Sequence, residues 1–579
     1  MAVAGAQWTG TPSIKGSTES IRMALLTFSL VGLQFTWGME MTYCTPYLLQ
    51  LGLTKSKLSL VWIAGPLSGL IMQPIVGIMA DKSKNKHGRR RPVMFVGSLL
   101  VGVCLLVLGW TDEIVGGFVK EKELRRELTI VLAVFSIYAL DFAINAVQSS
   151  CRSLIVDTLP VPKQQLGSAW ASRMTAVGHL IGYAIGATDL SLIFGGLIGD
   201  TQFKQLTVIA AVALILAVCV TSWAVTERVL ISDGFEDQKG NPILNTMSTI
   251  LHTTRNLPPR IQAICNIQFW TWIGWFPFLF YSSTWVGETY LRYDAPASVR
   301  NAPDSLSTIG RIGSTTLILF SIVTFICSLS LPWLVQSPDT PSSKTFTPRP
   351  PERLKPLLTL LPKSKPTLLT TWSASHLLFS LIMIFPPFIT SLRSASLIVA
   401  LSGLPWSLAS WAPFTFMGQE INRLPSSPLP KHARSTSTLS EAIPLEPASY
   451  NRVPTSLDLD ANHSPDATVL HIRQDSLTST SGLPPPSSSS DRAQGQTGEL
   501  AGIYLGILNL YTTLPQFVAT GISAVVFLVF EPGRAGGDGE VVKGVKMEGM
   551  SGIAVCLFVG AVSSVVAWVA TRRFAGMGE

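Results

Sequence analysis

The sequence predicts an all-α membrane protein with twelve transmembrane helices in two six-helix halves. Of its 579 residues, 13% are charged and 47% are hydrophobic, whereas a soluble globular chain carries about 25% charged residues. Uncharged stretches that are long enough to cross a bilayer recur along the chain, since about 20 apolar residues suffice for a helix. These two observations exclude an ordinary soluble enzyme and favour one large membrane domain.

Twelve apolar ranges are expected to form the spans. In chain order they are 22–48, 57–80, 92–110, 128–157, 168–190, 205–226, 260–285, 308–334, 367–391, 395–417, 500–530 and 549–571. In the fifth range Gly178, Gly182 and Gly186 recur every four residues. This spacing is typical of faces on which two membrane helices pack closely.

Two polar stretches divide the chain. Residues 227–259 are expected to form a central cytosolic loop, which separates an N-terminal six-helix half (1–226) from the first four helices of the C-terminal half (260–419). Residues 420–499 are rich in Ser, Pro and Thr, a composition typical of disorder. We expect a disordered cytosolic loop there, as a passive linker or else as a regulatory segment, followed by two helices and a cytosolic tail (500–579).

Lys and Arg collect in the loops that follow even-numbered spans. Segment 81–92 has six basic residues and one acidic residue, and segment 336–366 has six and two. The loop at 111–127, which follows an odd span, has four basic and five acidic residues. The positive-inside rule therefore places the even loops and both termini in the cytosol. Because these loops account for the net charge of +8, we expect no nucleic-acid partner.

Charged residues inside the spans are the main candidates for function, because a charge near the bilayer centre costs roughly 2.5–3.5 kcal/mol. Asp141 lies near the middle of the fourth span, and Arg152 follows about three helical turns later. The two side chains should therefore look into one cavity, with Asn145 and Gln148 on the same face. A structural ion pair with another helix is the alternative.

Three further sites are weaker candidates. In the first span Gln34, Trp37 and Glu40 fall at helical spacing, which favours a cavity-facing role over an interfacial one. Arg311 opens the apolar part of the eighth span and could instead extend to the aqueous interface. Aromatic residues gather in the seventh span, where Trp275 is a possible platform for a sugar ring; packing and an interfacial belt are the alternatives.

Sequence motifs of soluble catalysis are absent. The chain has no GxxxxGK[ST], HExxH or GxSxG segment. Its seven cysteines all lie in apolar segments and no pair has CxxC spacing, so neither a zinc site nor a disulfide framework is indicated. We therefore expect a protein that is not an enzyme and that uses no cofactor and no metal.

The loop after the second span carries the clearest family resemblance. The segment GIMAD at 77–81, followed by KHGRRRP at 86–92, is similar to the GxxxD…GRR loop of the major facilitator superfamily, in the longer form found in sucrose carriers. The resemblance implies a conformational latch at the cytosolic helix ends. Its four residues would be Asp81, Gly88, Arg89 and Arg90.

Shorter matches extend the resemblance over most of the membrane part. They include LD at 140–141, CRSL at 151–154, WFPFL at 275–279, RIG at 311–313 and LPQ at 514–516. The chain resembles the proton-coupled sucrose and α-glucoside carriers in the glycoside–pentoside–hexuronide:cation symporter branch of that superfamily. Glu40 makes the first span more similar to fungal and animal members of this branch than to plant members, and the long loop at 420–499 favours a fungal type. The resemblance implies a major facilitator fold and a sugar substrate.

From the residues and the resemblance together we expect proton symport of a disaccharide, such as sucrose, maltose or a related α-glucoside, by alternating access. Asp141 would carry the proton, with Glu40 as a secondary proton site. The expected sugar contacts are Arg152, Asn145, Gln148, Gln34, Trp37, Trp275 and Arg311.

An uncoupled sugar facilitator and a transporter-like sugar sensor are the alternatives on the same fold, and a membrane-embedded enzyme is the alternative from another class. The expected partners are a small sugar, protons and membrane lipid. The expected location is the plasma membrane rather than the vacuole.

Overall fold

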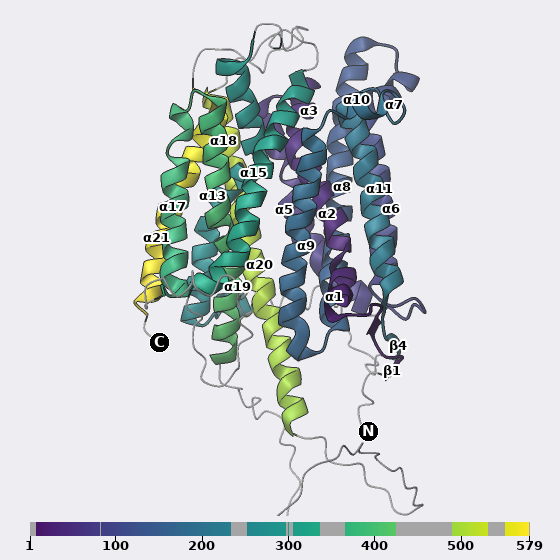
Figure 1. Ribbon diagram of the computed structural model, residues 1–579, viewed down its shortest axis with the longest axis vertical. Helices are drawn as coiled ribbons and strands as arrows, with labels where there is room; N and C mark the ends of the chain where they lie inside the picture. Colours follow the sequence, from purple (N-terminus) through teal and green to yellow (C-terminus); the bar gives the residue numbers. More distant parts are fainter. Residues whose placement is uncertain are drawn as a thin grey trace, which may run out of the picture. The chain divides into compact units, whose positions relative to one another are not determined.

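The computed structural model describes residues 7–81, 83–232, 252–296, 299, 305–335, 365–423, 489–530 and 550–577. These residues form α-helices and two short two-stranded sheets (Figure 1). The chain divides into two compact units, one made of residues 1–421 and 501–579 and the other of residues 422–500. All contacts described below lie within the first unit.

Two sets of helices follow one another along the chain. The N-terminal helices are α1 (Glu19–Thr27), α2 (Ser29–Met39), a π-helical turn (Glu40–Cys44), α3 (Thr45–Gln50), α4 (Lys55–Val61), α5 (Ala64–Asp81), α6 (Arg91–Gly109), α7 (Thr111–Phe118), α8 (Lys122–Thr158), α9 (Val161–Ala187), α10 (Leu190–Phe194) and α11 (Gln202–Ala224). The C-terminal helices are α13 (Pro259–Thr289), a π-helical turn (Tyr290–Asp294), α15 (Ser305–Leu334), α17 (Leu368–Met383), a 3-10 turn (Pro386–Phe388), α18 (Leu392–Leu401), α19 (Gly403–Arg423), α20 (Ser489–Phe530) and α21 (Gly552–Ala575).

The all-α membrane character predicted from the sequence is confirmed. Within the described ranges, nine helical segments are long and apolar enough to cross a membrane. Each of the twelve expected ranges coincides with a helix or a run of short helices, but 22–48, 168–190 and 260–285 are not among the nine. The count of twelve spans therefore stays a prediction.

The predicted domain boundaries also stay predictions. Most of the expected central loop (233–251) and of the expected disordered loop (424–488) lies outside the described residues. The same is true of residue 82 and of residues 336–364, which belong to the two basic loops.

Several helices begin at a hydroxyl residue whose side-chain oxygen accepts a backbone N–H of the first turn. These capping residues are Thr18 of α1, Thr54 of α4, Thr201 of α11, Thr367 of α17 and Ser391 of α18. Such a cap satisfies one of the backbone donors that a helix start leaves free, and its loss costs about 0.5–2 kcal/mol. The caps fix where these helices start.

The two ends of the bundle differ, and we name them by their elements. The α10 end carries α3, α7 and α10, and the β1 end carries α1 and the strands (Figure 1). At the β1 end, β1 (Gln7–Thr9) pairs with β4 (Val229–Ser232), and β2 (Ser13–Ile14) pairs with β3 (Val225–Thr226), both antiparallel. The segment before α1 is thus tied to the segment after α11, which closes the set of N-terminal helices.

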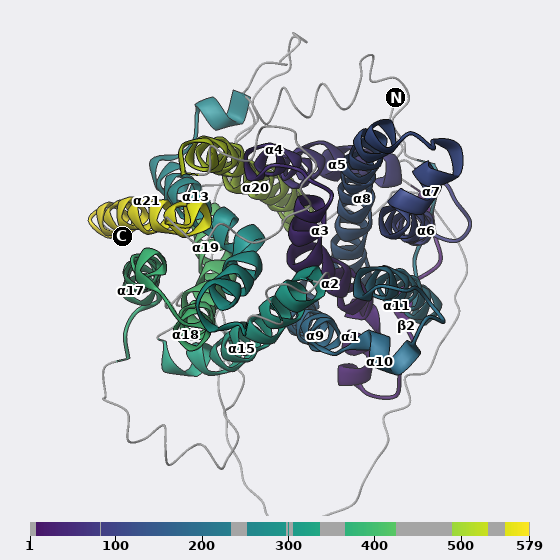
Figure 2. The same ribbon diagram turned by 90° about the horizontal axis from the view of Figure 1, so that it is seen from above.

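The N-terminal and C-terminal helices lie side by side when seen along the bundle, and they meet where α9 contacts α15 (Figure 2). Glycines allow α9 to approach both neighbours. A Cβ on Gly178 would lie 2.6 Å from the carbonyl oxygen of Val31 on α2, and one on Gly186 would lie 2.7 Å from Oγ of Ser314 on α15. The predicted small-residue face is therefore confirmed as a packing face.

Gly178→Val should destabilise the protein, because the new side chain would push α2 away from α9. Overpacking of this kind costs about 1–3 kcal/mol. Thermal unfolding of the purified protein in detergent should show a lowered midpoint, with reduced surface abundance in cells. Gly521→Val is the matched control, since a Cβ at this position in α20 meets nothing within 4 Å. Equal midpoints for the two variants would contradict the close packing of α9 on α2.

Candidate functional site

Two buried carboxyl groups face each other between α2 and α8. Glu40 opens the π-helical turn at the end of α2, and Asp141 lies in the middle of α8. Their residues are 0% and 1% exposed, the two carboxyls interact with each other, and none of their four oxygens has a hydrogen-bond donor among the described residues. Two ionised carboxylates in such a place would repel each other and lack solvation. The pair can form a hydrogen bond only if one carboxyl holds a proton.

The π-helical turn explains how Glu40 reaches this position. Pro46 follows the turn at the start of α3, and it has no backbone N–H to continue an α-helical ladder. The backbone N–H of Glu40 is shared between the carbonyls of Thr36 and Trp37. Single π-helical turns inside membrane or soluble helices are frequent at functional sites. Here the turn interrupts the first apolar range at the residue that carries the buried acid.

Polar side chains link α2, α8 and α5 around this pair. The indole N–H of Trp37 donates to Oε1 of Gln148 (3.3 Å). The amide of Asn145 donates to Oγ of Ser68 on α5 (2.8 Å) and to the backbone carbonyl of Asp141 (3.0 Å). The structure therefore brings together residues that the sequence placed on two separate helices.

Arg152 and Gln34 complete the set predicted on α2 and α8. Gln34 is buried on α2, one turn before Trp37. Arg152 is exposed, and within the described ranges it makes no hydrogen bond or ion pair. Arg152 does not pair with Asp141 in this conformation, so Arg152 is a cation available to a ligand. Among the described residues, no group of three or more His, Cys, Asp or Glu could hold a metal ion.

Trp275 lies in the core of the C-terminal helices rather than on a cavity wall. Its residue is buried, and its ring centroid is 4.0 Å from that of Phe379, 4.9 Å from Trp406 and 5.4 Å from Phe278. These contacts support the packing alternative in this conformation. The sugar contact predicted for Trp275 stays untested.

Arg311 forms an ion pair that joins the C-terminal helices to the N-terminal ones. Its Nη1 lies 2.6 Å from Oδ2 of Asp189, just before α10, and Oδ1 of Asp189 accepts a hydrogen bond from Ser191 (2.6 Å). The hydroxyl of Ser191 and the neighbouring guanidinium hold the pKa of Asp189 below its usual range. A carboxyl with a lowered pKa contributes to stability above its usual pKa, and the contribution is lost as the pH falls through the lowered value.

A buried ion pair lies at the same end. Nζ of Lys55, the first residue of α4, is 2.6 Å from Oε1 of Glu288 near the end of α13, and their side chains are 3% and 5% exposed. Hydroxyl groups add further contacts between the two sets of helices: Thr45 to the carbonyl of Phe280, Ser283 to that of Met41 and Ser56 to that of Ala524. The α10 end is therefore closed by polar contacts.

Lys55, Glu288 and Asp189 were not identified as site residues from the sequence. Lys55 and Glu288 lie just outside the predicted apolar ranges, where charges were not considered as candidates, and Asp189 lies one residue before the end of the range 168–190. One signal in the sequence could have found the first two. The lysine comes just before the second span and the glutamate just after the seventh, and the topology places these two span ends on the same side of the membrane.

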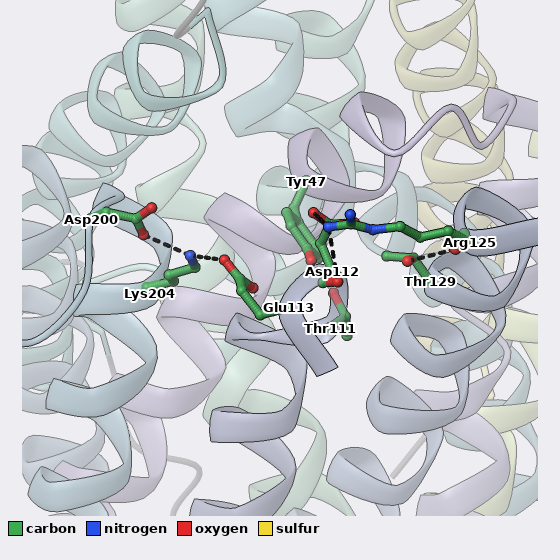
Figure 3. Close-up of polar contacts among 8 residues, drawn as sticks. All are labelled: Tyr47, Thr111, Asp112, Glu113, Arg125, Thr129, Asp200 and Lys204. Atoms are coloured by element: carbon green, nitrogen blue, oxygen red, sulfur yellow. Dashed lines mark hydrogen bonds and ion pairs between the residues drawn. The ribbon is translucent and has the colours of Figure 1, made fainter. Parts of the chain in front are cut away.

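A second group of polar contacts at the α10 end stays within the N-terminal helices (Figure 3). It consists of Tyr47 with Thr111, Arg125 with Asp112, Thr129 with the carbonyl of Arg125, and Lys204 with both Glu113 and Asp200. The Arg125–Asp112 pair is 38% and 56% exposed, and an exposed pair contributes only about 0–1 kcal/mol. These contacts fix α7 and the start of α11 without joining the two sets of helices.

At the β1 end, two carboxylates hold the loop that resembles the superfamily's latch. Glu227 accepts the backbone N–H groups of Arg89, Arg90 and Arg91 at 3.0, 2.9 and 2.9 Å. Asp157, near the end of α8, pairs with Nη2 of Arg89 (2.6 Å) and with Nε of Arg90 (2.9 Å). A carboxylate at the N-terminus of α6 is also favoured by the helix dipole. The side chains of both predicted arginines thus bind Asp157 of α8, while Glu227, just after α11, holds the backbone of the loop.

Gly88 is required by this arrangement. Its φ is +102°, and a Cβ there would lie 2.6 Å from Oε1 of Glu227. Asp81 ends α5, but its side chain lies outside the described residues, so its part in the latch stays a prediction. Asp157 and Glu227 were not identified as site residues from the sequence, because one lies at a span end and the other opens the polar central stretch.

Comparison with known proteins gives the family. A model described as the Major Facilitator Superfamily matches residues 25–299. Over 460 residues the chain is 35% identical to the General alpha-glucoside permease of Schizosaccharomyces pombe, an alignment that covers 70% of this chain and 82% of the permease. The chain belongs to the major facilitator superfamily.

Other relatives agree with this membership. The chain is 29% identical over 292 residues to Sucrose transport protein SUC4 of Arabidopsis thaliana, covering 47% of this chain and 56% of that protein. The crystal structure of a D-xylose-proton symporter has a TM-score of 0.51 at 12% identity, covering 96% of this chain and 98% of that one, which bears on the fold alone. The predicted major facilitator fold is confirmed, and so is the prediction that this superfamily member is a transporter and not an enzyme.

Glu288→Gln should weaken closure of the α10 end, because it removes the charge that Lys55 faces in a buried place. Removing one partner of a buried pair costs about 3–5 kcal/mol. Closure can be measured by cross-linking Ser56→Cys to Ala524→Cys, since these residues are in contact in the closed arrangement. We expect less cross-linking in Glu288→Gln and partial recovery when Lys55→Gln is added.

The matched control is Asp112→Asn, which breaks an exposed ion pair at the same end without touching the C-terminal helices. It should cross-link as the unmodified chain does. If Glu288→Gln behaves like this control, the buried pair does not hold the α10 end closed.

Proposed function

We propose that this major facilitator superfamily member carries out proton symport of a disaccharide, such as sucrose, maltose or a related α-glucoside. The observation that carries the proposal is the Glu40–Asp141 pair, whose oxygens are buried with no other donor among the described residues. The naming of relatives as an alpha-glucoside permease and a sucrose transport protein supports sugar as the substrate class.

The carboxyl pair suits a proton carrier because the number of protons it holds depends on whether water or a ligand reaches it. While the site is closed, one proton is shared between the two acids, and a second proton would neutralise them. When water or a sugar hydroxyl reaches the pair, the ionised form gains donors and a proton can be released. One proton crossing a membrane potential of 100 mV supplies roughly 2.3 kcal/mol. Because about 1.4 kcal/mol corresponds to a tenfold concentration ratio, this energy can drive more than tenfold accumulation of the sugar.

The sugar is expected to bind beside this pair. Arg152 is exposed and has no protein partner among the described residues, so its guanidinium can donate to sugar hydroxyls or to ionised Asp141. Gln148, held by Trp37, offers further amide groups. Asn145 and Gln34 lie on the same two helices. Trp275 and Arg311 act in packing and in closure in this conformation, and any contact with the sugar would have to form in another one.

The closed α10 end fits alternating access, in which each side of the carrier opens in turn. The loop with Arg89 and Arg90 lies at the β1 end, and the positive-inside rule assigns such basic loops to the cytosol. We therefore place the β1 end in the cytosol together with both termini, and the α10 end outside. The proposed location is the plasma membrane rather than the vacuole.

Asp141→Asn should abolish concentrative uptake and sugar-driven proton entry, because an amide cannot carry the proton. Exchange of sugar down its gradient should persist, since the shape of the site is kept. The measurement is uptake of radiolabelled sucrose and maltose, with external pH recorded, at matched surface expression. Asp112→Asn, an exposed acid away from the pair, should leave both signals unchanged.

Glu40→Gln should also impair coupling, and the double variant should be no worse than Asp141→Asn alone, because both residues serve one step. Accumulation with proton influx in Asp141→Asn would show that Asp141 is not the coupling residue. An unmodified chain that equilibrates sugar without any change in external pH would instead identify an uncoupled facilitator.

A further inference from the structure

A cavity separate from the carboxyl pair lies between α13, α20 and α21. Its volume is about 660 Å³, and the three helices neighbour one another at one edge of the bundle (Figure 2). Its lining includes Pro259, the first residue of α13, and Met577, just after the end of α21. The cavity therefore begins at the β1 end of the bundle and extends along the helices from there.

The mouth of this cavity is polar and positively charged. Gln262 and Asn266 lie one turn apart on α13, and Arg573 lies in the last turn of α21; all three line the cavity and are exposed. Within the described ranges none of these side chains has a hydrogen-bond or ion-pair partner. Arg260 differs, since it pairs with Glu420 at 2.9 Å. Arg573 is thus a cation for which the described residues supply no partner.

Further along the helices the lining becomes apolar. Trp270, Val566, Val569 and Ala570 line this part. Trp270 is about 12 Å beyond Gln262 along α13, at 1.5 Å per residue. Val566 and Val569 are exposed, as are Val562 and Val565 on the same helix, so the cavity continues into the lipid-facing surface of α21. A ligand that fits this gradient has a charged head and a hydrocarbon tail.

We propose that this cavity binds an anionic phospholipid of the cytosolic leaflet, with its phosphate at Arg573 and an acyl chain along the two valines. Arginine binds phosphate through several N–H donors in a fixed plane, and the amides of Gln262 and Asn266 add donors beside it. Basic pockets between helices on the cytosolic side are typical sites for anionic headgroups. The proposal rests on the orientation given under the proposed function, and not on proton coupling.

A soluble phosphorylated compound would offer the same phosphate chemistry. We assign the site to a lipid because most of its lining is apolar and is continuous with the exposed apolar face of α21. A bound lipid would also bridge α13 and α21, which pack against each other along their length.

The test uses the purified full-length protein in neutral detergent. The protein is titrated with phosphatidylinositol, phosphatidylserine or phosphatidylcholine, and lipid binding is measured by thermal unfolding and native mass spectrometry. Anionic lipids should bind and raise the unfolding midpoint more than phosphatidylcholine. Arg573→Gln should weaken the binding of anionic lipid about fivefold, as expected for one basic residue at a charged lipid surface. Arg572→Gln is the matched control, because the neighbouring arginine lies over Trp568 and does not line the cavity.

Three outcomes would overturn the proposal. The first is equal binding of anionic lipid and phosphatidylcholine, and the second is an equal loss of lipid binding in Arg573→Gln and Arg572→Gln. The third is displacement of the lipid by glycerophosphoinositol at equal concentration. The last outcome would indicate a soluble phosphate ligand. The orientation is tested separately by labelling Arg573→Cys in intact cells, which should require permeabilisation. Sugar-driven proton entry by Arg573→Gln should persist, so failure of lipid binding and failure of symport are distinguishable.

Discussion

The structure depends on the difficulty of placing charge where water is absent. Glu40 and Asp141 are buried between two helices, and no other group in the described part of the chain donates to them. They can share the site only with a proton between them. This constraint turns a pair of acids, which would otherwise destabilise a membrane bundle, into a group whose charge depends on access to water or ligand. A transporter that opens to each side in turn provides that access on two sides at different times.

The same constraint explains the ion pairs at the two ends of the bundle. Lys55 and Glu288 are almost fully buried and lie on different sets of helices, so their separation must be accompanied by hydration of both charges. At the β1 end, Asp157 and Glu227 bind the arginine loop within the N-terminal helices, so this contact can stay intact while the two sets move. Opening of the α10 end in the proposed alternating access must instead break the ion pairs that join the N-terminal helices to the C-terminal ones.

Much of the site could be predicted from the sequence because it depends on one helix at a time. Asp141, Asn145 and Gln148 share α8, and helical spacing alone places them together. The spacing of Trp37 and Glu40 likewise indicated a functional face on α2, and the bond from Trp37 to Gln148 joins the two faces.

The contacts between distant helices could not be predicted in this way. Glu288 meets Lys55 and Arg311 meets Asp189 across more than a hundred residues of chain, and local periodicity carries no information about such partners. Trp275 shows a second limit of prediction from the sequence. An aromatic residue in an apolar run packs in the core as readily as it lines a cavity, and the sequence does not distinguish the two. The π-helical turn at Glu40 was also unforeseen, although Pro46 pointed to a local departure from α-helical geometry.

Under the proposed proton symport, that turn connects the proposed proton site with the closed end. It begins at Glu40, its next residue Met41 accepts the hydroxyl of Ser283 through its carbonyl, and Thr45 directly after it donates to the carbonyl of Phe280. Both partners lie on α13, which also carries Glu288. If Glu40 gains and loses the proton as proposed, the change falls on the backbone segment whose hydrogen bonds hold α13. In the proposed mechanism, Glu40 and the residues that hold α13 are therefore separated by no more than this one turn.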